Sequence, residues 1–221
     1  MDSMGGNEDA APQLATTPDD PSMPDERLAE RKSTLRKELR AARASMSVAD
    51  RRAAGQALRD TLLGLPEVGM AGTVAAYLSV GPEPETTGLV FALWKRGTYV
   101  LLPVLRPDMD LDWASYEGPD SLRDGSSSPY GLLEPAEPPR GREAIRSADL
   151  LIVPALAADR RGNRLGRGGG CYDRALARVA PSVPTIALLY DHELLDEVPA
   201  GAFDQRVRSV AQPGRGITKL G

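Results

Sequence analysis

The sequence predicts an α/β fold with three layers, in which a largely parallel central sheet is covered by helices on both faces. Three observations predict it. From residue 73 onward, short apolar runs alternate with segments of helical periodicity. An apolar share of 41% in 221 residues is enough for one substantial core. One of the apolar runs, residues 149–154, leads through a loop of Gly and Arg into a helical segment, which is a common connection in such sheets.

The N-terminal segment differs from the rest of the chain. Residues 1–26 contain seven Asp or Glu and no Lys or Arg, and they lack apolar periodicity. Such a composition cannot bury enough apolar surface to fold, so we expect a disordered acidic tail. We expect a single α/β domain over residues 27–213 and a flexible C-terminal tail over residues 214–221.

Two helices are expected to open the domain. Leu28, Leu35 and Leu39 are spaced along one helix face, and Lys and Arg crowd the remainder of that segment. Ser47 and Asp50 then form a capping-box pattern that begins a second helix, which ends near residue 63.

Strands and helices alternate after these two helices. A further helix is expected over residues 86–94 and another from about residue 170. The segment 118–142 is rich in Gly, Pro and Ser and is interpreted as a long ordered loop near a site. The expected strands are residues 73–80, 98–105, 111–116, 150–153, 184–190 and 207–211.

Composition excludes several kinds of chemistry. Cys171 is the only cysteine, which excludes an internal disulfide and a cysteine-based zinc site. His192 is the only histidine, which excludes a multi-histidine metal site and leaves a Ser–His–Asp hydrolase dependent on one residue. That residue follows a strand, where a solvated or capping role is expected. No apolar run reaches the ~20 residues of a membrane span, and no signal peptide is present, so we expect a cytoplasmic protein.

The net charge of −4 conceals a basic domain. Removing the seven tail acids from the 31 Asp and Glu leaves 24, against 27 Lys and Arg, so the remainder carries about +3. This excess suits an anionic small molecule. It is too weak for a nucleic-acid binder, which usually has a dense basic patch.

The most informative segment is residues 163–174, with four glycines and three arginines. Glycines let backbone N–H groups approach an anion, and arginines supply forked donors that match phosphate oxygens. A helix beginning behind the loop adds partial positive charge. The segment therefore indicates a phosphate cradle at the carboxyl end of a strand, with an ordinary flexible loop as the alternative.

The loop lacks features of two common phosphate-binding motifs, the Walker A loop and the dinucleotide fingerprint. No Lys-Ser/Thr pair closes a Walker A frame. In a dinucleotide fingerprint counted from Gly166, the third glycine position is occupied by Cys171, although Asp191 could serve as the expected acid. The dinucleotide interpretation is weakened and stays open. Arg164 and Arg167 favour a more highly charged ligand, such as a nucleoside triphosphate.

Residues 153–174 closely resemble the signature of 5-formyltetrahydrofolate cyclo-ligases, also called methenyltetrahydrofolate synthetases. The resemblance extends over about residues 30–213. Weaker matches occur in the same order as in that family, at residues 32–36, 77–86, 130–135 and 198–204. The chain departs from the family where Cys171 replaces a tyrosine, Gly169 replaces a lysine of some members, and Phe203 replaces a polar residue. Nothing near Cys171 resembles a base, so we expect a packed residue there.

The resemblance implies a fold similar to the NagB/RpiA/CoA transferase-like proteins. It also implies ATP-dependent cyclisation of 5-formyltetrahydrofolate, with or without a polyglutamate tail, through a phosphorylated formyl group, with ATP and Mg²⁺ required. The protein is expected to be a monomer that binds this small molecule, without nucleic acid or membrane. Alternatives are a non-catalytic folate- or nucleotide-binding homologue and an enzyme similar to sugar-phosphate isomerases or CoA transferases.

The resemblance also implies roles for individual residues. Catalytic roles fall to Arg167 and Tyr172, and Mg²⁺ ligation to Asp173 and Asp204. The implied ATP contacts are Lys32, Arg36, Arg164, Leu165, Gly166, Arg167, Gly168, Gly169, Gly170, Cys171 and Tyr172. The implied folate contacts are Glu83, Tyr130, Arg167, Gly168, Gly169, Gly170 and Cys171.

Overall fold

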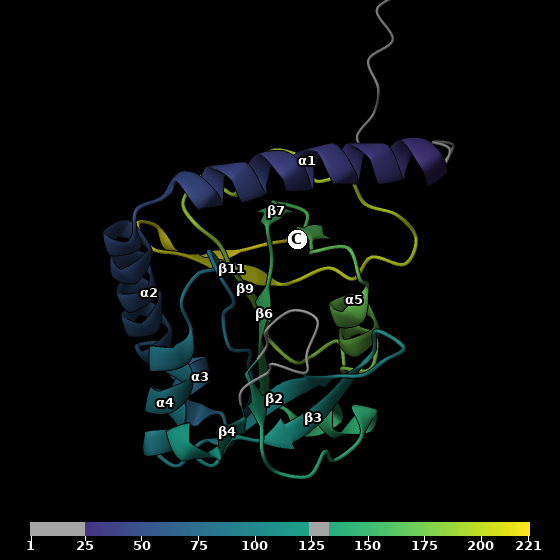
Figure 1. The fold of residues 1–221 in the computed structure, drawn as a ribbon. Coiled ribbons are helices and arrows are strands. Elements are labelled where there is room, and N and C mark those ends of the chain that lie inside the picture. The colour runs from purple at the N-terminus through teal and green to yellow at the C-terminus, as the bar shows by residue number, and fades with distance from the viewer. Residues whose placement is uncertain (1–24, 124–132) are drawn as a thin grey trace, which may run out of the picture.

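The computed structural model describes residues 25–123 and 133–221. Its main feature is a seven-stranded sheet in the order β12-β11-β9-β6-β1-β2-β3 (Figure 1). The five inner strands are parallel neighbours, and the edge strands β3 and β12 pair antiparallel. The largely parallel sheet predicted from the sequence is confirmed. The strand bounds are β1 Thr73–Ala75, β2 Tyr99–Leu105, β3 Leu111–Ser115, β6 Leu150–Pro154, β9 Thr185–Leu188, β11 Ser209–Gln212 and β12 Gly216–Lys219.

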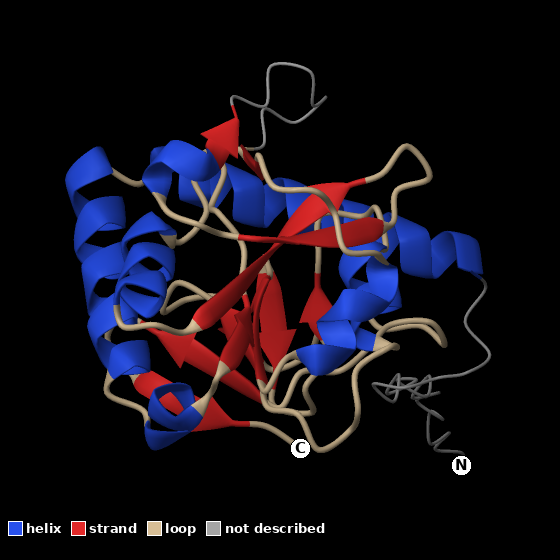
Figure 2. Cartoon of the chain, turned by 90° about the horizontal axis from the view of Figure 1, so that it is seen from below, coloured by secondary structure: helices blue, strands red, loops and turns tan. Residues whose placement is uncertain are grey.

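Helices cover both faces of this sheet (Figure 2). One face carries α2 (Val48–Leu63), α3 (Pro66–Met70) and α4 (Thr87–Lys95). The other carries α5 (Cys171–Leu176) and the 3₁₀ helix η3 (Arg142–Ser147). Successive side chains of a strand point to opposite faces, so the apolar run of β6 divides between two cores. Leu150 and Ile152 pack under α2 and α4, whereas Leu151 and Val153 pack under α5.

The first helix, α1 (Asp25–Ser45), lies across the end of the sheet where β6 leads into β7 (Figure 1). It packs on a small second sheet of β10 (Leu194–Leu195), β7 (Ala157–Asp159) and β8 (Arg164–Leu165). Leu39 is buried with Leu156, Leu165 and Val198 in a third core. This packing places the polar face of α1 over the carboxyl ends of the strands.

The predicted cap of α2 is present, and that of α4 has another function. The Ser47 hydroxyl accepts from the Asp50 N–H at 3.0 Å, as a capping residue does. Thr86 occupies the N-cap position of α4, but its side chain makes no cap hydrogen bond there. Its hydroxyl donates to the Tyr77 carbonyl at 2.7 Å and accepts from the Ser79 N–H at 2.9 Å. Thr86 therefore closes the loop between β1 and α4, which contains Glu83.

The domain extends further in both directions than the sequence indicated. Helix α1 begins at Asp25, two residues earlier than expected. Residues 214–221, expected to be a flexible tail, contain β12, which pairs with β11 over four residue pairs. Gly216 has φ +68° and makes the turn between them, and Ile217 packs on the core. A strand this short leaves no periodicity to detect in the sequence.

The segment 118–142, expected to be an ordered loop, contains three short elements among its described residues. These are η1 (Pro119–Ser121), β4 (Leu122–Arg123) and β5 (Glu134–Pro135), and the last two pair antiparallel. Tyr130, expected to contact folate, lies outside the described residues.

Candidate functional site

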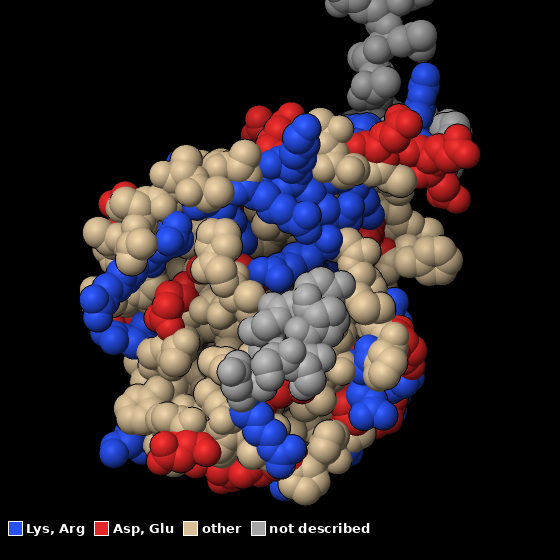
Figure 3. Space-filling model, in the orientation of Figure 1, with Lys and Arg blue, Asp and Glu red and all other residues tan. Residues whose placement is uncertain are grey.

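A cavity of about 720 Å³ lies beyond the carboxyl ends of β1, β2 and β6, where α1 crosses the sheet. Its volume is within the range of small-molecule sites, roughly 300–1,000 Å³. Figure 3 shows Lys and Arg gathered below α1 in the middle of this face. Among the described lining residues, the basic ones outnumber the acidic ones, which are Glu83, Asp173 and Asp204. The basic lining residues are Lys32, Arg36, Arg40, Arg43, Arg164 and Arg167.

Helix α1 forms one wall of the cavity and hydrogen-bonds the loop of residues 166–170, which we call the glycine loop. Lys32, Arg36 and Arg40 follow one another at intervals of four, so they share one face of the helix. Arg36 Nε donates to the Gly166 carbonyl at 2.9 Å, and Arg40 Nη2 donates to the Arg167 carbonyl at 3.1 Å. Burial lowers the pKa of Arg36, and so does the nearby charge of Arg40. An anion bound beside this pair would relieve their mutual repulsion.

The glycine loop packs closely against arginine side chains, and two of its residues have backbone angles that favour glycine. Gly168 and Gly170 have φ of +112° and +67°, in the region that favours glycine. A Cβ atom at Gly166 would lie 2.9 Å from Arg164 Nη1, and one at Gly168 would lie 3.4 Å from Arg36 Cζ. These contacts explain why glycines occupy the loop, and they place guanidinium groups on both sides of it.

Arg164 is a buried cation whose donors are only partly used. Its Nη2 donates to Asp173 Oδ1 at 2.6 Å. Its Nε has no hydrogen-bond partner among the described residues. Asp173 Oδ1 also accepts from the Gln205 N–H at 3.1 Å, so that carboxylate is shared. A buried guanidinium with remaining donors, lining a cavity, is suited to an anionic ligand.

Arg167 and Glu83, expected to contact phosphate and folate, pair with each other. Arg167 Nε lies 2.9 Å from Glu83 Oε1, and Arg167 Nη2 donates to the Val80 carbonyl at 3.2 Å. The second carboxylate oxygen of Glu83 accepts from the Val80 N–H at 2.8 Å. The Glu83 side chain is buried, whereas that of Arg167 is 42% exposed. The ion pair is therefore open to the cavity on the Arg167 side only.

Three side chains at the floor of the cavity remain uncharged at neutral pH. Burial raises the pKa of Tyr172 and of Tyr77, and the charge of Glu83 adds to both shifts. The Tyr77 hydroxyl is buried without a partner among the described residues. Burial also raises the pKa of the Cys171 thiol. A neutral, partly buried thiol is a poor nucleophile, which agrees with the packing role expected for Cys171.

The two carboxylates expected to bind metal, Asp173 and Asp204, both line the cavity. Asp204 forms an ion pair with Lys32 and accepts from the Gly201 N–H at 2.6 Å. Among the described residues, no group of three or more His, Cys, Asp and Glu could hold a metal ion. Mg²⁺ is commonly held by one or two carboxylates together with substrate phosphates. The donor set therefore fits Mg²⁺ that is shared with phosphate.

The structure adds residues that sequence reasoning missed. Arg40 and Arg43 received no role from the sequence, although they continue the helical spacing of Lys32 and Arg36 into the cavity. No sequence signal pointed to the apolar wall from the β2–β3 hairpin. That wall consists of Pro103, Leu105, Met109 and Leu111.

His192, on which a hydrolase would depend, and Asp191, which a dinucleotide site would use, both lie away from the cavity. His192 is half exposed and stacks on Tyr190, with ring centroids 6.3 Å apart. Asp191, the acid that a dinucleotide site would use, accepts from the Gly214 N–H at 2.9 Å. Neither His192 nor Asp191 is among the lining residues of the described chain. The structure thus gives no support to a histidine-dependent hydrolase or a dinucleotide site.

Comparison with known proteins agrees with this geometry. Residues 28–213 match the model of the 5-formyltetrahydrofolate cyclo-ligase family. The chain belongs to this family. The 5-formyltetrahydrofolate cyclo-ligase of Mycolicibacterium smegmatis is 43% identical over 194 residues, which cover 86% of this chain and 97% of the relative. That of Escherichia coli K12 is 32% identical, over 73% of this chain and 88% of the relative.

Solved structures show the same fold. The NMR structure of Aquifex aeolicus 5,10-methenyltetrahydrofolate synthetase superposes with a TM-score of 0.73 at 28% identity, covering 86% of this chain and 92% of that one. The synthetase from Mycoplasma pneumoniae, at 18% identity and a TM-score of 0.63, supports the fold alone. The family expected from the sequence is confirmed. Within the described residues, no helix has the length and apolarity needed to cross a membrane.

Proposed function

We propose that the protein uses ATP to convert 5-formyltetrahydrofolate into 5,10-methenyltetrahydrofolate, releasing ADP and phosphate. Family membership supports the overall reaction. The observation that supports ATP most directly is the grouping of Lys32, Arg36, Arg164 and Arg167 around one glycine loop. These cations come from segments more than 120 positions apart, and together they suit a polyphosphate. The apolar wall opposite suits the pteridine ring.

The chemistry requires activation of the formyl group. A formamide is a poor electrophile because its nitrogen donates into the carbonyl. In the proposed reaction the formyl oxygen attacks the γ-phosphorus and ADP leaves, which forms an imidate phosphate. N10 then attacks the formyl carbon and loses its proton, and phosphate departs with the former formyl oxygen. Positioning and charge neutralisation carry most of such a reaction, so neither His nor Cys is needed.

We assign the residue roles from the family resemblance and from the place of each residue in the cavity. Lys32 and Arg36 bind the β- and γ-phosphates from α1, and the amides of residues 166–170 bind them from the opposite side. Arg167 exchanges Glu83 for the transferring phosphoryl group, because its own side chain is 42% exposed in the present ion pair. Glu83, released from Arg167, then hydrogen-bonds the folate. Tyr172 stays neutral and is therefore able to donate a hydrogen bond.

Mg²⁺ would be held by Asp173 and Asp204 together with phosphate oxygens. Each carboxylate is now bound to a cation, Arg164 and Lys32 respectively. When bound, Mg²⁺ neutralises phosphate charge and orients the phosphates. In this arrangement Lys32 and Arg164 are also freed from their carboxylates, so that their donors turn to phosphate.

A turnover assay tests the proposal. Purified protein with Mg-ATP and 5-formyltetrahydrofolate should develop the near-ultraviolet absorbance of the methenyl product, with one ADP formed per product. Reactions without ATP or without Mg²⁺ are the controls. Binding of both ligands without absorbance would instead indicate a non-catalytic homologue, in which the substitutions Cys171 and Phe203 have abolished turnover.

A further inference from the structure

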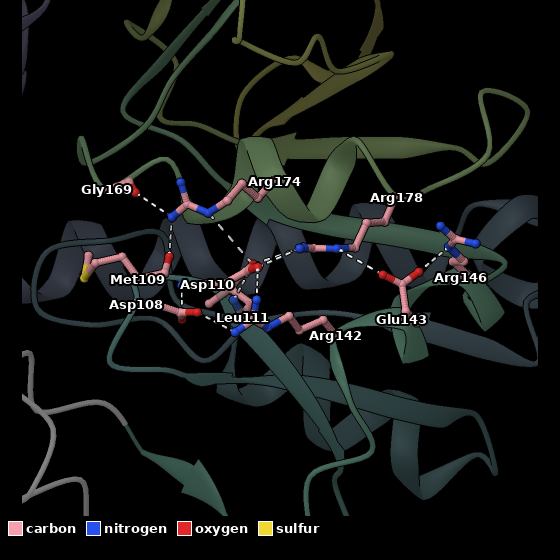
Figure 4. A network of polar contacts seen from close by, with 10 residues as sticks. All are labelled: Asp108, Met109, Asp110, Leu111, Arg142, Glu143, Arg146, Gly169, Arg174 and Arg178. Atoms are coloured by element: carbon pink, nitrogen blue, oxygen red, sulfur yellow. Dashed lines mark hydrogen bonds and ion pairs between the residues drawn. The ribbon is translucent and has the colours of Figure 1, made fainter.

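A network of charged residues lies behind the glycine loop, outside the cavity (Figure 4). Its centre is Asp110, which is buried at the end of the β2–β3 turn. Arg178 binds Asp110 with two hydrogen bonds of 3.0 and 2.6 Å, and Arg142 Nη1 lies 3.3 Å from the same carboxylate. Arg174 Nε lies 3.9 Å from it on a third side. Three arginines thus converge on one carboxylate.

Among the described charged residues of this network, Arg174 is the one that hydrogen-bonds the loop. Its Nη2 donates to the Gly169 carbonyl at 2.9 Å and also to the Met109 carbonyl. A Cβ atom at Gly170 would lie 2.9 Å from Arg174 Nη1, so the guanidinium lies directly against that residue. Gly169 and Gly170 line the cavity, whereas Arg174 is not among the lining residues of the described chain. Arg174 therefore supports the loop from behind.

The hydrogen bond from Arg174 to the Gly169 carbonyl fixes the direction of the Gly169–Gly170 peptide group. In a trans peptide the C=O and the following N–H point in opposite directions. Because the Gly169 carbonyl points at Arg174, the N–H of Gly170 points away from it. Glycines on both sides give this peptide more rotational freedom than other residues would have, so an external hydrogen bond is needed to hold it.

The β2–β3 turn, against which Arg174 lies, is itself held by several backbone and side-chain contacts. Met109, whose carbonyl shares Arg174 with Gly169, has φ +62°, which is uncommon for a residue other than glycine. Asp110 next to it accepts from the Leu111 N–H at 2.8 Å as well as from Arg178. Five residue pairs join β2 to β3 below the turn. Loss of Arg174 would free the Gly169 carbonyl, whereas the β2–β3 pairing and the Asp110–Arg178 hydrogen bonds would still hold the hairpin.

We infer that Arg174 is a positioning residue for nucleotide binding, which holds the Gly169–Gly170 peptide so that its N–H meets a phosphate oxygen, with Asp110 as its anchor. The inference rests on the proposed function, since it assigns the loop to phosphate. It predicts that the two substrates differ in how strongly their binding depends on Arg174. Folate binding against the hairpin wall should be insensitive to Arg174, and nucleotide binding should depend on it.

The test compares Arg174→Ala with Arg178→Ala, which removes the same charge from the same carboxylate without touching the loop. The dissociation constant of a non-hydrolysable ATP analogue with Mg²⁺ is measured by calorimetry, beside the melting temperature and both KM values. Arg174→Ala should weaken analogue binding and raise the KM for ATP by roughly 10- to 100-fold, by analogy with the loss of residues that orient metal ligands. The KM for folate should not change.

The control and the conservative variant make the outcome decisive. Arg178→Ala should lower the melting temperature and leave analogue binding within about twofold of wild type, because the loop contact persists. Arg174→Lys should restore part of the affinity, and it replaces the alanine variant if that fails to fold. Analogue binding equal to wild type in Arg174→Ala, or equally weakened in both alanine variants, would overturn the inference. Failure of the wild-type protein to bind the analogue would contradict the proposed function itself.

Discussion

At the scale of single residues, the cavity depends on charged groups whose present partners are replaceable. Arg167 pairs with Glu83, Lys32 with Asp204, and Arg164 with Asp173. Each ion pair holds its two side chains in position. The proposed function assigns a ligand to both members of each pair. In the proposed function, the residues that hold the site together are therefore also the ones that recognise its substrates.

Arg167→Ala tests this dual role. Loss of a group that stabilises transition-state charge should reduce kcat by about 10²–10³. The melting temperature should hardly change, because the ion pair with Glu83 is exposed on the arginine side. Steady-state kinetics and thermal denaturation measure the two effects. A stable variant with near-normal kcat would remove Arg167 from the chemistry.

Asp204→Asn tests the metal assignment. The Mg²⁺ concentration for half-maximal turnover should rise, because a neutral amide is a weaker ligand for a hard cation. Folate binding should be preserved, since asparagine still accepts from the Gly201 N–H. Glu197→Gln is the control, because it removes another ion pair with α1, that of Arg31. If both variants give the wild-type Mg²⁺ titration, Asp204 is purely structural.

The single thiol offers a test of the cavity's electrostatics. Burial raises the pKa of Cys171 above its ordinary value of 9.0, so the thiol is protonated at pH 7 and ionises only above that value. Alkylation by iodoacetamide should be slow at pH 7 and accelerate as the pH rises past 9, because the thiolate is the nucleophile. Mass spectrometry across pH gives the titration. An inflection below pH 8 would show an activated thiol instead.

At the scale of elements, the position of α1 depends on a buried ion pair. Arg43 donates to both carboxylate oxygens of Glu193, at 2.7 and 2.8 Å, and to the Ala155 carbonyl at 2.6 Å. Its guanidinium also lies over the Tyr190 ring, 5.4 Å from the centroid. Burial alone lowers the pKa of Arg43, but its hydrogen bonds and Coulombic attraction to Glu193 raise it overall. This pair fixes the helix that carries Lys32 and Arg36 over the cavity.

Arg43→Met should destabilise the fold by about 3–5 kcal/mol, because it leaves the Glu193 carboxylate buried without its cation. Adding Glu193→Gln should recover part of that loss, since the amide oxygen still accepts from the Tyr190 N–H without a buried charge. Denaturant titration of the single and double variants measures the coupling. Arg31→Ala, on the same helix but at an exposed pair, should cost less than about 1 kcal/mol. Equal losses at the two arginines would contradict the anchoring role.

At the scale of the whole molecule, the two ends of the chain differ in what they contribute. Strand β12 closes one edge of the sheet; Ile217 within it and Leu220 directly after it pack on the two cores. Deleting residues 214–221 should lower the melting temperature by roughly 5 °C or more, since each kcal/mol lost shifts it by about 2–4 °C in a domain of this size. Deleting residues 1–24, before α1 begins, should leave melting temperature and turnover unchanged. Calorimetry of both truncations checks these expectations.

The sequence by itself determined the layered fold and the family, and it predicts a phosphate-binding loop. These follow from local patterns: the period of apolar residues in β6 and α1, and the grouping of Gly and Arg over residues 163–174. The tertiary structure alone decided that Arg167 pairs with Glu83, that the β2–β3 hairpin supplies the apolar wall, and that residues 216–219 form a strand. The physical reason is that these features depend on contacts between residues far apart in the chain. Such contacts form only when the sheet brings the carboxyl ends of its strands together, so neither partner carries a local signal of the other.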